Sequence, residues 1–139
     1  MSEIHTPLIP LGQFTNPWNY SNGRLHGDNG AQAHIITLPP DGVFLKTLRI
    51  KGFLGPGSSL YAELYRTPKD DFGGLPSVDP IVAQTITTPP TGVFDESISL
   101  TLSGKNVVDN AVYNYSVAVV ANTTGPSDFA FVGEIALSY

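Results

Sequence analysis

Apolar and polar residues alternate in short runs over most of the chain. In residues 97–103, Ile98, Leu100 and Leu102 alternate with serine and threonine. Successive side chains of an extended segment point to opposite faces, so one face of this run is apolar and the other is small and polar. The pattern predicts a half-buried antiparallel strand. Similar alternation predicts strands at residues 34–38, 43–53, 59–66, 81–87, 111–121 and 128–139.

Glycine and proline interrupt the alternation between these runs, for example at residues 55–57 and 72–76. Seven or eight short strands separated by turn signals, with no convincing helix, are typical of an all-β sandwich or barrel. We therefore expect an antiparallel β-sandwich of the jelly-roll type. The last two strands are expected to form a hairpin through residues 122–126.

One predicted strand has an imperfect pattern. In residues 43–53, Leu45 falls on the same face as the charged residue Lys51. One extra residue inserted into the strand would restore the alternation, so a β-bulge is expected near Lys46 or Thr47.

The sequence contains one internal similarity, between residues 39–44 (PPDGVF) and residues 89–94 (PPTGVF). Each copy would lead from the end of one strand through a Pro-Pro-x-Gly turn into the next strand. Two copies are too few to build a repeat protein. Either the chain has two similar halves, as expected for paired Greek keys, or the same favourable turn occurs twice.

The N-terminal part of the chain lacks a clear period. Residues 6–30 are rich in proline, glycine and asparagine and carry isolated large apolar side chains. We expect residues 1–33 to form an extended arm and residues 34–139 to form the sandwich domain. The arm would either wrap its own sandwich, with Phe14 and Trp18 at the edge of the core, or reach a neighbouring subunit.

Composition narrows the function classes. The chain has no cysteine, which excludes disulfides, zinc-thiolate sites and cysteine nucleophiles. Only 14% of residues are charged, so small polar residues and tyrosine cover much of the surface, and such a covering favours contact with protein or sugar. The net charge is −5 and the seven basic residues are scattered, which argues against nucleic acid as a partner. No apolar run approaches about 20 residues and the first residues do not resemble a signal peptide, so we expect neither a membrane partner nor export.

Two groups of residues have metal-ligand side chains. His26, Asp28 and His34 would meet if their loop folds back, but glycine-rich loops also carry solvated His and Asp without a metal. Acidic residues in turns would suit calcium, or would serve only solubility. These acids are Asp70, Asp71, Asp79, Asp95, Glu96 and Asp109.

The sequence gives no support for catalysis. Facing carboxylates for glycoside hydrolysis would have to come from Glu63 and Glu134, and nothing in the sequence brings the two together. The chain has neither a Gly-x-Ser-x-Gly motif nor a phosphate-binding glycine loop. We expect no enzyme activity, no cofactor and no resident metal.

Tyrosines provide the clearest candidate surface. Tyr61 and Tyr65 flank Glu63 on one face of a predicted strand, opposite its leucines. Aromatic rings stack on sugars, and tyrosine is also frequent in protein interfaces, so the outer face of this sheet would meet a glycan or another subunit. The predicted contact residues are Phe14, Trp18, Tyr20, Tyr61 and Tyr65.

The C-terminal residues carry a resemblance to known proteins. Residues 108–110 (VDN), 113–119 (YNYSVAV) and 135–139 (IALSY) are similar to the endings of small jelly-roll virion proteins of bacteriophages and related viruses. This resemblance implies a trimer-forming virion component, either a capsid decoration protein or a receptor-binding head domain of a tail.

Our leading hypothesis is therefore a non-catalytic structural protein of a virion. It would assemble in the host cytoplasm as a homo-oligomer, with a trimer favoured, and bind a larger assembly such as a capsid. The alternative is a carbohydrate-binding β-sandwich module or lectin that binds a glycan. A small hydrolase using Glu63 or Glu134 is a third class.

Overall fold

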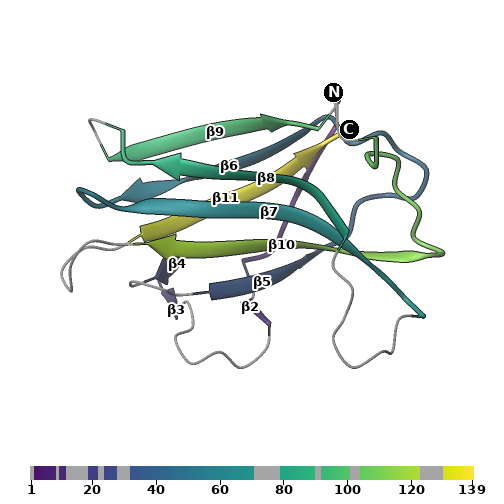
Figure 1. Ribbon diagram of the computed structural model, residues 1–139, viewed down its shortest axis with the longest axis horizontal. Helices are drawn as coiled ribbons and strands as arrows, with labels where there is room; N and C mark the ends of the chain where they lie inside the picture. The colour runs from purple at the N-terminus through teal and green to yellow at the C-terminus, as the bar shows by residue number, and fades with distance from the viewer. Residues whose placement is uncertain are drawn as a thin grey trace.

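The protein is an all-β sandwich. The computed structural model describes residues 2–8, 10–11, 19–21, 24–27, 32–70, 79–89, 92–100, 104–122 and 130–139. Within these residues the chain forms eleven strands in two antiparallel sheets and contains no helix (Figure 1). Consequently, the described part of the chain has no helix with the length and hydropathy needed to cross a membrane.

The six-stranded sheet is arranged around the C-terminal strand. Its order is β3-β4-β11-β6-β9, and β1 pairs with β11 along the same edge as β4. The strands are β1 (Glu3–His5), β3 (Asn19–Ser21), β4 (Arg24–Gly27), β6 (Thr47–Leu54), β9 (Val93–Ser99) and β11 (Ala130–Ser138).

The five-stranded sheet forms the other layer, in the order β2-β5-β10-β7-β8. Its strands are β2 (Pro10–Leu11), β5 (Gln32–Thr37), β7 (Ser59–Pro68), β8 (Asp79–Thr87) and β10 (Tyr113–Asn122).

The pairing of the eight longer strands has jelly-roll topology. The first of them pairs with the last, β4 with β11, and the next three pairs are β5 with β10, β6 with β9 and β7 with β8. This nested pairing folds a long double ribbon into two layers, which is the arrangement of a jelly roll. The predicted jelly-roll sandwich of seven or eight strands is confirmed.

The predicted hairpin of the last two strands is wrong. Strand β10 pairs with β5 and β7, whereas β11 lies in the other sheet and pairs with β6, β4 and β1. Each strand has one apolar face, represented by Val117 and Ile135, and both residues are fully buried. The two faces therefore meet across the core, and alternation alone does not distinguish this packing from edge-to-edge pairing.

The start of strand β6 also differs from prediction. Strand β6 begins at Thr47, and the residues before it form a corner in which Phe44 makes an isolated bridge to Val107 and Leu45 is fully buried. A bulge near Lys46 or Thr47 is therefore not needed, and that prediction is wrong. The irregularity in this sheet lies on β11 instead, at Gly133.

The predicted strand at residues 97–103 begins earlier than expected, because β9 spans Val93–Ser99. Its inward face is as predicted, since Ile98 and Leu100 are buried. Residues 101–103 lie outside the described part of the chain.

Both Pro-Pro-x-Gly segments carry the chain from the five-stranded sheet to the six-stranded sheet. The first leads from β5 to β6 and the second from β8 to β9. Gly42 and Gly92 both have φ of 76°, a conformation that only glycine adopts at little cost. Because β6 and β9 are antiparallel, the two corners lie at opposite ends of the sandwich (Figure 1).

The described residues of the predicted arm include strands β1 to β4, which belong to the two sheets of the sandwich. Thr6 joins the two layers, because its amide donates to the carbonyl of Ile135 in one sheet and its hydroxyl bonds to that of Thr37 in the other. The two chain ends are also paired, since Ser2 and Tyr139 exchange two backbone hydrogen bonds. Phe14 and Trp18 lie outside the described residues.

The core lies between the layers and is made of aliphatic side chains from both. Its largest fully buried side chains are Ile35, Leu45, Leu48, Ile50, Leu54, Leu60, Leu64, Leu100, Ile135 and Leu137, together with Tyr115. Burial of this apolar surface is the main force that stabilises the sandwich.

Candidate functional site

The outer face of the five-stranded sheet carries the residues that the sequence singled out. On β7, Leu60, Ala62 and Leu64 are fully buried in the core, so Tyr61 and Tyr65 point the other way. Both tyrosines therefore lie on the outer face, as the alternation predicts. Tyr20 lies in β3 of the other sheet, and its side chain is outside the described residues.

Tyr65 is not an exposed platform. Its neighbour on β10 is the small residue Ser116. The hydroxyl of Tyr65 lies 2.5 Å from Nδ1 of His34 on β5. The two rings meet edge to face with centroids 5.6 Å apart. Tyr65 is consequently only 8% exposed, and this burial raises the pKa of its phenol.

Tyr61 and Glu63 form a second polar pair on β7. The Tyr61 hydroxyl donates to Oε2 of Glu63 at 2.6 Å, and this hydrogen bond raises the pKa of Tyr61. Both side chains are half-buried, so the pair leaves polar atoms and part of an aromatic ring in contact with solvent.

A groove of about 590 Å³ runs along this outer face toward one end of the sheet. Its floor includes Asn114 and Ser116 on β10, whose side chains point outward. Apolar residues at the end of β5 and just after it form one wall, including Ile36 and Leu38, and residues at the end of β7 form the other. The remaining lining residues are Thr37, Pro39, Thr67, Lys69, Asn110 and Tyr115.

Hydrogen bonds hold the far end of the groove in place. Asn110 donates its side-chain amide to the carbonyl of Pro39 at 2.9 Å and its backbone amide to Asp41 at 2.7 Å. Lys69 donates to the carbonyl of Asn110 at 2.5 Å, and its backbone amide donates to Val112. These bonds tie the end of β7 and the first corner to the segment before β10.

The groove is suited to an uncharged or weakly charged ligand. Among the described residues that line it, Lys69 is the one with a charge. The amides, hydroxyls and exposed aliphatic side chains offer hydrogen bonds beside apolar contact, the combination that orients small ligands in protein sites.

Most residues of this groove were not predicted from the sequence. Thr67, Lys69 and Asn110 come from segments that are distant in sequence, and they line one space only because β7, β10 and the first corner converge. Asn114 was visible only as a polar position within an alternating strand.

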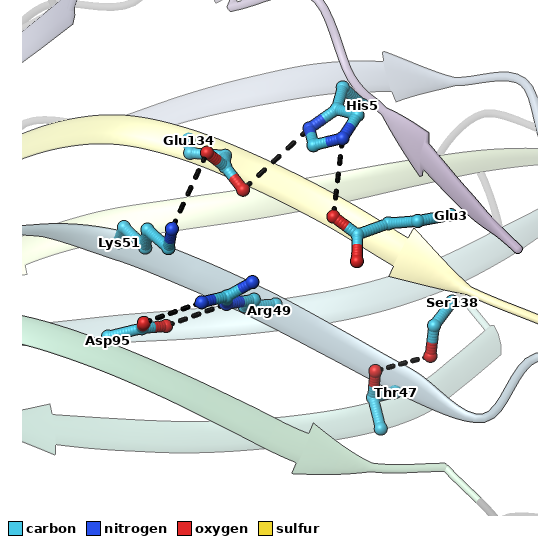
Figure 2. Close-up of polar contacts among 8 residues, drawn as sticks. All are labelled: Glu3, His5, Thr47, Arg49, Lys51, Asp95, Glu134 and Ser138. Carbon is cyan, nitrogen blue, oxygen red and sulfur yellow. Dashed lines mark hydrogen bonds and ion pairs between the residues drawn. The ribbon is translucent and has the colours of Figure 1, made fainter. Parts of the chain in front are cut away.

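Two of the acids considered for calcium, Asp79 and Asp95, are instead paired with cations. Asp79 accepts hydrogen bonds from Lys105 and Arg66, and these two bonds lower its pKa. Asp95 forms a two-bond ion pair with Arg49 at 2.8 and 2.7 Å, which lowers the pKa of Asp95 (Figure 2).

The remaining acid and histidine candidates have other positions. Asp109 accepts the amide of Ala111 within its own turn. Glu63 and Glu134 lie on the outer faces of different sheets, so they do not form a hydrolytic pair. His34 bonds to Tyr65, while Asp28, Asp71 and the side chain of His26 are outside the described residues.

Comparison with known proteins finds similarity in structure but not in sequence. No family model and no curated protein matches the sequence. The structure is similar to the CBM36-1 domain of a multidomain xylanase from the hindgut metagenome of Trinervitermes trinervoides, with TM-score 0.51, 13% identity and coverage of 99% of this chain and 96% of that one. A second similar structure is the xylan-binding module CBM15, with TM-score 0.47, 10% identity and coverage of 98% and 95%. At these identities, the first likeness shows a shared β-sandwich fold.

Proposed function

We propose that this chain is a non-catalytic carbohydrate-binding module and that the groove on the five-stranded sheet is its glycan site. The observation that carries the proposal is the groove itself, in which neutral hydrogen-bonding groups lie beside exposed aliphatic side chains. Sugars present hydroxyls around a ring with apolar C–H faces, so they match both kinds of surface.

Individual residues have distinct tasks in this proposal. Asn114 and Ser116 on the floor exchange hydrogen bonds with sugar hydroxyls, since an amide and a hydroxyl both donate and accept. Ile36 and Leu38 contact the C–H face of the sugar. Because hydrogen bonds already fix the groove's end at Asn110, little ordering cost accompanies binding.

The fold supports the same choice of ligand class. A similar sandwich occurs in a domain of a xylanase, so xylan is the first polysaccharide to test. The positive charge of Lys69 in the groove also permits a glycan that carries acidic substituents.

A screen against a polysaccharide panel tests the proposal, followed by affinity electrophoresis of variants. Asn114→Ala should weaken binding about five- to tenfold, the effect of one lost hydrogen bond. The matched control is Asn122→Ala, an exposed asparagine at the far end of the same strand and outside the groove, which should bind like wild type. Absence of binding to every polysaccharide, or equal effects of the two variants, would count against the groove.

A second candidate function is the virion assembly role that the C-terminal resemblance implies. The observation that favours it is an apolar groove of about 310 Å³ between β1 and β5, lined by Ile4, Pro7, Ile36 and Leu38 among others. Leu38 is 76% exposed, and exposed apolar surface of this kind commonly marks a protein contact. Native mass spectrometry separates the candidates, because a stable trimer supports assembly and a monomer with glycan affinity supports the module.

A further inference from the structure

A cluster of three metal-ligand side chains lies on the outer face of the six-stranded sheet, the layer opposite the proposed glycan groove. Glu3 and His5 are two residues apart on β1, so they share a face. His5 pairs with Ala136 of β11, and Glu134 lies two residues before Ala136 on the same face. The pairing of the first and last strands thus brings these three residues together.

The three side chains already point toward one another (Figure 2). Nε2 of His5 lies 3.3 Å from Oε1 of Glu3, and Nδ1 of His5 lies 3.7 Å from Oε1 of Glu134. One ligand atom from each residue falls within 4.8 Å of the other two. The His5 side chain is 64% exposed, so an ion would reach the cluster from solvent.

We propose that Glu3, His5 and Glu134 form a binding site for a divalent transition-metal ion, with Zn²⁺ as the best-fitting ion. One imidazole and two carboxylates are a donor set that Zn²⁺ accepts, with water in the fourth position. Calcium favours six to eight oxygen ligands and fits this set poorly. Two ligands bound at about 2.0–2.1 Å in a tetrahedron lie roughly 3.3 Å apart, so the Glu3–His5 separation needs almost no change.

The ion would fasten the N-terminal strand to the C-terminal strand. Glu3 faces Nε2 of His5 whereas Glu134 faces Nδ1, and one ion binds one ring nitrogen, so the Glu134 side chain would have to turn toward Nε2 to complete the site. The backbones of β1 and β11 are already paired. Lys51 lies 3.9 Å from Oε2 of Glu134 and opposes a cation there (Figure 2). Removing that charge should therefore tighten binding.

Calorimetric titration of the full chain with ZnCl₂, together with thermal melting, tests this site. We expect one ion per chain, a melting temperature several degrees higher in excess Zn²⁺, and no comparable effect of Ca²⁺. His5→Ala and Glu134→Gln should each weaken Zn²⁺ binding at least tenfold, and Lys51→Met should strengthen it.

Glu63→Gln is the matched control, because it removes a carboxylate from the outer face of the other sheet and should leave Zn²⁺ binding unchanged. The melting temperature of each variant without metal is compared with that of the wild type to check that the variant folds. Glu3→Gln replaces any variant that does not fold. No stoichiometric Zn²⁺ binding by the wild type would overturn the proposal, as would binding that survives loss of both His5 and Glu134. Glycan binding is measured separately and does not affect either result.

Discussion

Substitution of Gly52 by alanine is the sharpest test of the packing between β6, β9 and β11. Gly52 pairs with Val132 on one side and Phe94 on the other. An added Cβ would lie 1.9 Å from the carbonyl oxygen of Phe131 and 2.8 Å from the ring of Phe94. A backbone oxygen cannot rotate away as a flexible side chain would, so β11 itself would have to move.

The expected cost of Gly52→Ala follows from that movement. Overpacking in a filled core costs about 1–3 kcal/mol, and displacement of the strand weakens at least one backbone hydrogen bond, which adds about 1 kcal/mol. We therefore expect the free energy of unfolding to fall by about 3 kcal/mol in urea denaturation, with an unchanged dependence on urea concentration.

Gly42→Ala is the matched control for this experiment. Gly42 has φ of 76°, and a Cβ there would meet nothing within 4 Å, so the substitution adds backbone strain alone. That strain costs about 1–2 kcal/mol. If Gly52→Ala costs less than about 1 kcal/mol, or less than Gly42→Ala, the close approach of β6 to the Phe131 carbonyl is refuted.

Two further predictions concern polar contacts at the sandwich end. Asp79→Asn should lower stability at pH 7 by about 1 kcal/mol, a value kept small because the side chain is 31% exposed. The pKa of Asp79 is lowered in the folded state, so this stabilisation is fully present above the unfolded pKa of about 3.9 and is lost as the pH falls from there through the lower folded pKa. The difference in unfolding free energy between wild type and Asp79→Asn should therefore be smaller at pH 3 than at pH 7. Tyr115→Phe should cost about 1–2 kcal/mol in urea unfolding, because the buried Tyr115 hydroxyl accepts the Asp109 amide at 2.9 Å, and an unchanged stability would show that this bond contributes nothing.

Alternation along the chain was sufficient to predict the sandwich and its inward faces. Leu60, Leu64 and Ile98 are buried where the pattern puts them, and Tyr61 and Tyr65 lie on the outer face. The period of two determines which side chains face the core, because that choice is made residue by residue within one strand.

Pairing between strands could not be predicted in the same way. The final strands β10 and β11 are neighbours in sequence with a turn-like segment between them, yet they lie in different sheets. Their apolar faces satisfy either arrangement, and the choice depends on which partners the rest of the chain supplies. For the same reason the groove residues Lys69 and Asn110, and the cluster of Glu3 with Glu134, could not be found from sequence spacing.

Nuclear magnetic resonance titration of the ¹⁵N-labelled protein with xylan-derived oligosaccharides, or with the best ligand from the polysaccharide panel, tests the central claim most directly. The account predicts that amide signals of Thr67, Lys69, Asn110, Asn114 and Ser116 shift as ligand is added, while those on the outer face of β6 and β9 stay in place. Shifts confined to the six-stranded sheet, or no shifts with any glycan, would contradict it.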